Sequence, residues 1–338
     1  MPQNWTDAGS PPASAGPIEK VLYEVKKTIV GQDPLLERLI VALLARGHIL
    51  VEGVPGLAKT LAVKSLAEAI GGDFHRVQFT PDLVPADILG TRIYHQPTGE
   101  FQVSLGPVFT NLLLADEINR APAKVQSALL ESMQERQVTL GDQTHKLPEP
   151  FMVFATQNPV EQAGTFELPE AQLDRFMLVH RLEYPTIEDE RQILTRNAAL
   201  GIQRMDKGAI VQTEFDVLEK QPVGSSDELV RAMEAVHHVH VSETFVEHVV
   251  GLVDRSRHHP AVELGCSPRA GISLIKASRA RALMHGRHYA IPEDLFALAE
   301  DVMLHRMRLK YEAIAEGVTG KAVLQELLRS LGGNATRT

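Results

Sequence analysis

The stretch Gly53-Val54-Pro55-Gly56-Leu57-Ala58-Lys59-Thr60 decides the fold class of this 338-residue chain. It follows an apolar strand predicted over His48–Glu52 and opens a helix predicted over Lys59–Ile70. A strand, a glycine-rich loop and a helix in this order form a phosphate-binding loop, because successive backbone N–H groups and the helix amino terminus can face a phosphate. Lys59 is expected to reach the β- and γ-phosphates, and Thr60 to hold Mg²⁺. Ala58 departs from the usual pattern, which has glycine before the lysine.

Two later strands end in polar side chains that suit nucleotide hydrolysis. Leu112-Leu113-Leu114-Ala115 runs into Asp116 and Glu117, and Phe154-Ala155-Thr156-Gln157 runs into Asn158. Asp116 is expected to hold Mg²⁺, Glu117 to polarise an attacking water, and Asn158 to orient that water at the carboxyl edge of the sheet. Two adjacent acids favour hydrolysis, because a small-molecule kinase would not need the second one.

In this order the three segments resemble the Walker A, Walker B and sensor 1 motifs of AAA+ ATPases. Ile29-Val30-Gly31-Gln32 is similar to the segment that lies against the adenine in that superfamily. The stretch 161–176, EQAGTFELPEAQLDRF, is similar to the most specific motif of the MoxR family. The loop ending Leu57-Ala58-Lys59-Thr60 and the stretch Asp116-Glu117-Ile118-Asn119-Arg120 resemble that family too. The resemblance extends over about residues 18–331.

The resemblance implies further residues, cofactors and partners. Arg175 has the position of the arginine finger, which reaches the γ-phosphate of a neighbouring subunit. Arg269 has the position of sensor 2, which the lid carries to the phosphate that Lys59 of the same subunit binds. ATP and Mg²⁺ are the implied cofactors. A homo-oligomeric ring, expected to be a hexamer, is implied, with a protein client and a partner that carries a von Willebrand A domain. The expected role is chaperone-like: remodelling, maturation or cofactor insertion.

The rest of the pattern predicts an α/β core with a parallel five-stranded sheet and a C-terminal all-helical lid. The strands are predicted at 48–52, 74–79, 112–116, 152–156 and 177–182, with helices between them, clearest at 122–135. Two β-hairpins are predicted as inserts, at 92–105 and 137–147, and only helices after Pro185. The expected boundaries are a disordered tail 1–17, a core 18–185, a lid 186–331 and a tail 332–338.

Composition narrows the function classes. The formal net charge is -9 and the pI about 5.9, which argues against a dedicated nucleic-acid binder. No apolar run reaches the ~18 residues of a membrane span, and the amino terminus lacks the features of a secretory signal, so a cytoplasmic location is expected. Three alternatives remain: the ATPase subunit of a metal chelatase or rubisco-type activase, a DNA-remodelling helicase, and a non-hydrolysing nucleotide-binding scaffold. The sequence names neither the client nor the partner.

Overall fold

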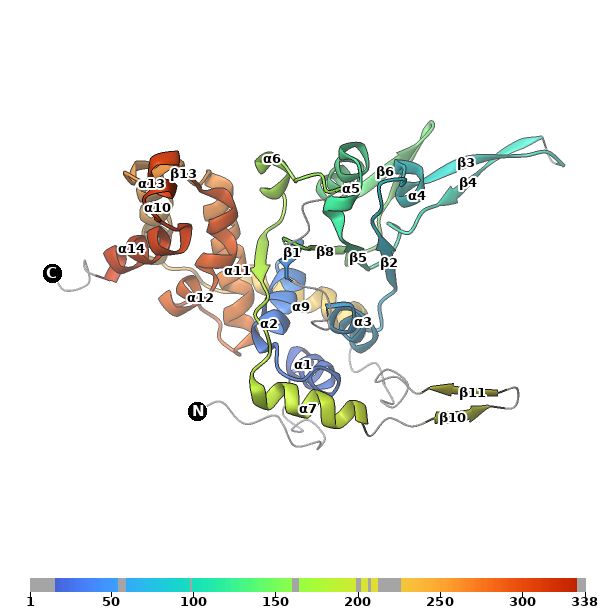
Figure 1. The fold of residues 1–338 in the computed structure, drawn as a ribbon, viewed down its shortest axis with the longest axis horizontal. Coiled ribbons are helices and arrows are strands. Elements are labelled where there is room, and N and C mark those ends of the chain that lie inside the picture. Colours follow the sequence, from blue (N-terminus) through green and yellow to red (C-terminus); the bar gives the residue numbers. More distant parts are fainter. Residues whose placement is uncertain are drawn as a thin grey trace.

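The computed structural model describes residues 16–53, 59–97, 99–159, 164–198, 202–205, 208–211 and 226–332. A parallel sheet with helices on both faces occupies the middle of the molecule, and the C-terminal helices gather beside its β9 edge (Figure 1). The predicted tails fall almost entirely outside the described residues. Helix α1 (Pro17–Thr28) begins at the last residue of the predicted amino-terminal tail.

The central sheet has five parallel strands in the order β2-β5-β8-β1-β9, which confirms the predicted sheet. The strands are β1 (Ile49–Glu52), β2 (Phe74–Gln78), β5 (Leu112–Asp116), β8 (Met152–Gln157) and β9 (Leu178–Arg181). Strands β1, β5 and β8 are almost completely buried. Helices cover both faces of the sheet, so the inner strands are continuously apolar rather than alternating.

Successive residues of the inner strands point to opposite faces and enter two separate hydrophobic cores. Leu114 and Phe154 belong to the core that contains helices α1, α2 and α3. Leu113 and Val153 belong to the core that contains α4 and α5. These helices are α2 (Asp33–Leu44), α3 (Lys59–Ile70), α4 (Pro85–Leu89) and α5 (Ala123–Glu135). Helix α2 begins at Asp33, and Gln32, in a left-handed conformation with φ 55°, precedes it.

Both predicted hairpins are present and antiparallel. They are formed by β3 (Gly90–His95) with β4 (Glu100–Leu105), and by β6 (Gln137–Leu140) with β7 (Gln143–Lys146). The β3–β4 hairpin projects away from the sheet (Figure 1). It exposes the rings of Tyr94 and Phe101, which are tilted by 58° relative to one another with centroids 5.3 Å apart. Arg92 connects the hairpins, because its guanidinium lies 5.1 Å from the Phe101 ring centroid and 2.8 Å from the Asp142 carboxylate.

The C-terminal part is helical, as predicted. Its helices are α7 (Ile187–Ala198), α9 (Ser226–His238), α10 (Glu243–His258), α11 (Pro268–Met284), α12 (Pro292–Met303), η2 (Leu304–Arg306), α13 (Tyr311–Ala315) and α14 (Gly320–Gly332). Ser242 caps α10, because its hydroxyl accepts a hydrogen bond from the Phe245 N–H. Helix α12 ends at Met303, and η2 follows it directly.

The expectation that strands disappear after Pro185 is wrong in two places. A hairpin is formed by β10 (Ile202–Met205) and β11 (Gly208–Val211), and a second short pair by β12 (Val262–Leu264) and β13 (Arg308–Leu309). The β12–β13 pair joins segments more than forty residues apart in sequence, and no local pattern predicts such a pairing. No helix of the described residues is long and apolar enough to cross a membrane.

Candidate nucleotide site

Four residues predicted to act on a nucleotide lie at one edge of the sheet. Strands β1, β5 and β8 are consecutive in the sheet and parallel, so their carboxyl ends share this edge. Asp116 ends β5 and Glu117 follows it, while the buried Asn158 follows β8. Lys59 is the first residue of α3, and its Nζ donates a hydrogen bond of 3.0 Å to the carbonyl of Gly53 after β1.

Lys59 has the environment of a phosphate ligand. Burial lowers the pKa of its amine, and the carboxylates of Asp116 and Glu117 act in the opposite direction. It lies with Thr60 in the first turn of α3, where the helix dipole adds positive charge. The loop residues between Gly53 and Lys59 lie outside the described residues; they are Val54, Pro55, Gly56, Leu57 and Ala58.

One buried hydroxyl, that of Thr156, bonds to the Asp116 carboxylate and to the backbone of Glu117. Thr156 Oγ1 donates a hydrogen bond of 2.6 Å to Asp116 Oδ1 and accepts one of 2.8 Å from the backbone N–H of Glu117. The other Asp116 oxygen, Oδ2, accepts from Arg76 on β2, with distances of 2.6 Å to Nη2 and 3.1 Å to Nε. The Asp116 carboxylate is therefore fixed on one side by the sheet and on the other by a cation that is half exposed.

Glu117 is held in an unusual backbone conformation. Its φ of 56° and ψ of 50° lie in the left-handed region, which non-glycine residues adopt at a cost of roughly 1–3 kcal/mol. Its Oε2 accepts hydrogen bonds from Gln78 Nε2 at 2.7 Å and from Arg120 Nε at 3.1 Å. The conformation turns the chain sharply after β5 and leaves the carboxylate between these two donors.

A buried amide connects the turn after Glu117 to the segment that leads to α6 (Glu170–Leu173). Gln126 Nε2 lies 3.2 Å and 3.1 Å from the carbonyl oxygens of Ile118 and Ala121, and 3.0 Å from that of Phe166. The Phe166 N–H also donates to the carbonyl of Asn119 at 2.6 Å. The turn and this segment are therefore held together by hydrogen bonds.

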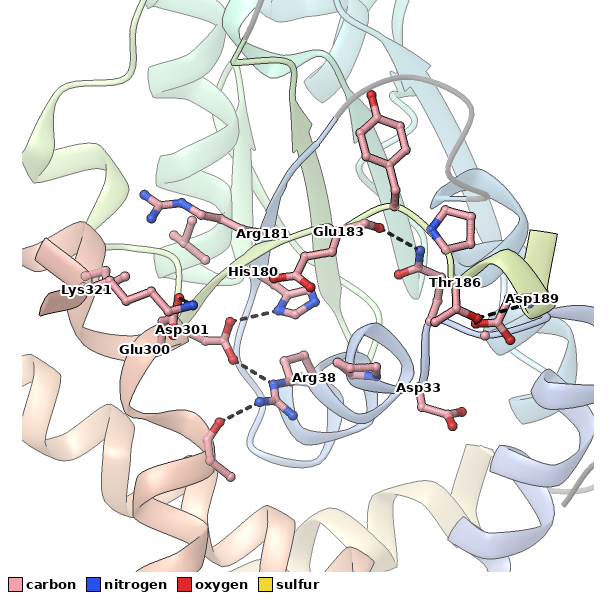
Figure 2. A pocket seen from close by; sticks show the side chains of 18 of the residues that line it. Asp33, Arg38, His180, Arg181, Glu183, Thr186, Asp189, Glu300, Asp301 and Lys321 are labelled. Carbon is pink, nitrogen blue, oxygen red and sulfur yellow. Dashed lines mark hydrogen bonds and ion pairs between the residues drawn. The ribbon is translucent and has the colours of Figure 1, made fainter. Parts of the chain in front are cut away.

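The segment predicted to lie against adenine borders a cavity of about 660 Å³ between α2, β9 and α12 (Figure 2). Gly31 and Gln32 line it; Val30 precedes them. A glycine is required at Gly31, because its φ is +66° and a Cβ would lie 2.9 Å from Cγ of Asp189. Gln32 Nε2 donates to the Glu183 carbonyl at 3.2 Å. The cavity has the size of an ordinary small-molecule site, roughly 300–1,000 Å³.

The opposite wall of the cavity joins the lid to the core. Figure 2 shows Asp301 of α12 between Arg38 of α2 and His180 of β9. Its oxygens lie 2.7 Å from Arg38 Nε and 2.9 Å from His180 Nδ1.

The two predicted arginines, Arg175 and Arg269, lie at the other edge of the sheet. Arg175 is two residues before Met177, whose N–H donates at 2.9 Å to the carbonyl of His48, the residue that precedes β1. Arg269 reaches the same place from α11, because its Nη1 lies 2.8 Å from Asp174 Oδ2. The structure therefore brings Arg175 and Arg269 together and keeps both away from Lys59.

This arrangement differs from the expectation that the lid carries Arg269 to the same nucleotide as Lys59. The length of β1, four residues at roughly 3.3 Å each, separates the two edges by about 13 Å. Arg269 is held at the amino edge by an ion pair with Asp174, and α11 packs on α2. The packing of the lid decides where Arg269 lies, and the sequence motif around Arg269 does not indicate that packing.

The residues at the carboxyl edge fit a nucleotide with Mg²⁺. Carboxylate and hydroxyl oxygens are the ligands that Mg²⁺ prefers, and Asp116 and Thr60 supply one of each. An amine and the amino terminus of a twelve-residue helix supply the positive charge that phosphates need.

Thr156, Arg76 and Gln78 were missed as site residues. Thr156 stands inside an apolar strand, and its role depends on the register in which Ala115 lies beside Ala155. Arg76 and Gln78 share one face of β2, a spacing that is typical of any half-exposed strand. Only the pairing of β2 with β5 brings them to Asp116 and Glu117.

Comparisons with known proteins agree with this geometry. Residues 48–178 match the family described as ATPase family associated with various cellular activities (AAA), and residues 254–327 match the AAA lid domain. The chain is 46% identical to Chaperone MoxR1 of Mycobacterium tuberculosis over 93% of this chain and 81% of the relative. It is 34% identical to Protein MoxR of Methylorubrum extorquens, over 92% and 90% of the two chains. A solved structure from Cytophaga hutchinsonii, assigned as an ATPase, superposes with a TM-score of 0.82 at 44% identity over 93% of both chains.

Proposed function

We propose a function for this chain from one premise: it belongs to the MoxR family of AAA ATPases. It is an enzyme that hydrolyses ATP. The proposed use of this activity is chaperone-like, namely the remodelling or maturation of a client protein, including insertion of a cofactor. The name chaperone, carried by the M. tuberculosis relative, supports this use.

The observation that carries the catalytic part of the proposal is the cluster at the carboxyl edge. Lys59, in the first turn of α3, binds the β- and γ-phosphates. Asp116 and Thr60 hold Mg²⁺, which when bound neutralises charge on the phosphates. Glu117 accepts a proton from the attacking water, and the amide of Asn158 orients that water. The Gly31–Gln32 segment and its cavity receive the base.

The arginines at the amino edge act on a neighbouring subunit. Arg175 and Arg269 lie at the edge of the sheet opposite to Lys59, so they are not placed against the phosphates of their own subunit. In a ring, the amino edge of one subunit faces the carboxyl edge of the next, and both arginines then stabilise the charge that develops on the neighbour's γ-phosphate. Such a cation contributes roughly 10³–10⁵ in rate.

The proposal includes a hexameric ring in the cytoplasm, with a partner that carries a von Willebrand A domain. The β3–β4 hairpin is the proposed contact for the client. Its exposed Tyr94 and Phe101 side chains support this role, because aromatic side chains provide large apolar contact area on a projecting element.

Mixing two inactive variants tests the shared site. Lys59→Ala loses the phosphate ligand and Arg175→Ala loses the finger, so each is expected to be inactive alone. A mixed ring contains interfaces where an intact Lys59 meets an intact Arg175, and ATP turnover should partly return. Arg191→Ala, which removes an exposed arginine on α7, is the matched control and should retain full activity.

Assembly of the mixture is measured by light scattering. Rescue would support catalysis between subunits. Absence of rescue at every ratio, with rings assembled, would contradict it. Capture of client and partner with Glu117→Gln protein loaded with ATP tests the chaperone role; recovery of the same set of proteins by Lys59→Ala protein would contradict nucleotide-dependent client binding.

A further inference from the structure

The buried guanidinium of Arg306 bonds the lid to the segment that carries Arg175. Arg306 is in η2, and only 3% of its side chain is exposed. Its Nε donates to Asp174 Oδ1 at 2.7 Å, and Nη2 to the carbonyls of Phe176 at 2.8 Å and Asp174 at 3.2 Å. Nη1 donates to Met177 O at 3.3 Å and to Val302 O. A guanidinium has five N–H donors, so all are used, four of them on residues 174–177.

The Asp174 carboxylate is shared between two lid arginines. Its Oδ1 accepts from Arg306 and its Oδ2 from Arg269, at 2.8 Å. Burial lowers the pKa of Arg306, and the contact with Asp174 opposes this change. One carboxylate therefore neutralises a buried cation and orients a second, exposed one.

The next residue in the chain is Arg175. Its backbone is fixed on one side by the Asp174 contacts and on the other by the Phe176 carbonyl, which accepts from Arg306 and lies 3.3 Å from His305 Nε2. Separation of the lid from residues 174–177 would break four of the five hydrogen bonds of the Arg306 guanidinium, including its ion pair with Asp174. Arg175 therefore keeps its position relative to the lid.

We propose that Asp174 is a positioning residue: it fixes Arg175 to the lid through Arg306 and holds Arg269 beside it, so that the lid of one subunit sets how both arginines meet the phosphate of its neighbour. This inference rests on the proposed function in trans. A carboxylate outside the nucleotide site thus controls catalysis in the next subunit.

The test is Asp174→Asn, which keeps the shape and removes the charge. Its own Lys59 and Asp116 are at the other edge, so nucleotide affinity should stay within about twofold while kcat falls by about 10²-fold, the loss that a displacement near 1 Å can cause. Glu170→Gln is the matched control. It makes the same change in an exposed ion pair between α6 and the lid, Glu170 with Arg308 at 3.3 Å, and should leave kcat unchanged.

Mixed rings separate positioning from damage to the fold. Asp174→Asn subunits have an intact Lys59 site, and Lys59→Ala subunits have an intact finger, so their mixture should regain activity. A variant that is only destabilised would regain none. Asp174→Glu, which keeps the charge but lengthens the side chain by one methylene, serves if Asp174→Asn does not fold, and it should also lower kcat without lowering nucleotide affinity.

Two results would overturn the inference: wild-type kcat in folded Asp174→Asn rings, or loss of nucleotide affinity in place of kcat. Mixing Arg175→Ala with Lys59→Ala is run in parallel. If that pair also fails to regain activity, the proposed function in trans fails. If only the Asp174→Asn mixture fails, the role of Asp174 alone is wrong.

Discussion

Replacement of Thr156 by valine should disconnect Asp116 from the backbone of Glu117 without changing the volume of the core. The hydroxyl–carboxylate bond to Asp116 contributes about 1.5–3 kcal/mol, and an amide left without an acceptor at Glu117 costs about 1–3 kcal/mol. The amide is only partly buried, so we expect the free energy of unfolding to fall by about 2–4 kcal/mol. Because the Asp116 carboxylate and the backbone N–H of Glu117 each lose a fixed partner, kcat should fall about 10- to 100-fold, whereas the Kd for a nucleotide should change little.

The assay is steady-state ATP turnover, with nucleotide binding and urea unfolding measured on the same preparations. Thr156→Ser is the matched control, since it retains the hydroxyl and loses only a methyl group; it should keep kcat within a few-fold of wild type. Equal loss of kcat in the valine and serine variants would show that packing, not the hydroxyl, is what matters. Wild-type kcat in folded Thr156→Val would refute the positioning role directly.

Three further predictions concern charge. Lys59→Ala should abolish ATP binding, measured by calorimetry, whereas Glu117→Gln should bind ATP and lose hydrolysis; equal loss of binding in both would contradict the assigned roles. Arg76→Gln removes the cation from Asp116, so the Mg²⁺ concentration that gives half-maximal turnover should fall about 3- to 10-fold, and a rise would show that Arg76 assists rather than competes with the metal. Burial lowers the pKa of His48 from 6.5 to about 4. The unfolded chain thus binds this proton more tightly, so stability is fully present above pH 6.5 and should fall by about 3 kcal/mol as the pH drops to 4; His48→Gln should flatten that dependence in urea unfolding.

The nucleotide edge could be predicted from sequence because it depends on local order. Each strand is followed directly by its functional side chain, and parallel strands end at a common edge, so Asp116 and Asn158 had to lie near the start of α3. The hairpins were predicted for the same reason, since each is a short-range pairing around a turn.

Features that depend on distant contacts could not be predicted. Arg269 lies in a recognisable motif, but its place is decided by an ion pair with a residue 95 positions away. No sequence motif around Arg306 indicates that its guanidinium is buried and bonded to five acceptors. The β12–β13 pairing also depends on how two lid segments pack together. In each case long-range geometry, absent from any window of sequence, decides the result.

Arg92 holds the two hairpins together. Its guanidinium rests on the Gly141 backbone, where an added Cβ would come within 2.6 Å, and it pairs with Asp142. Strand β6 continues directly from α5, and α5 carries Gln126, whose amide contacts the turn after Glu117. The tip of β3–β4 is therefore connected to the turn after Glu117 through one guanidinium, one helix and one amide.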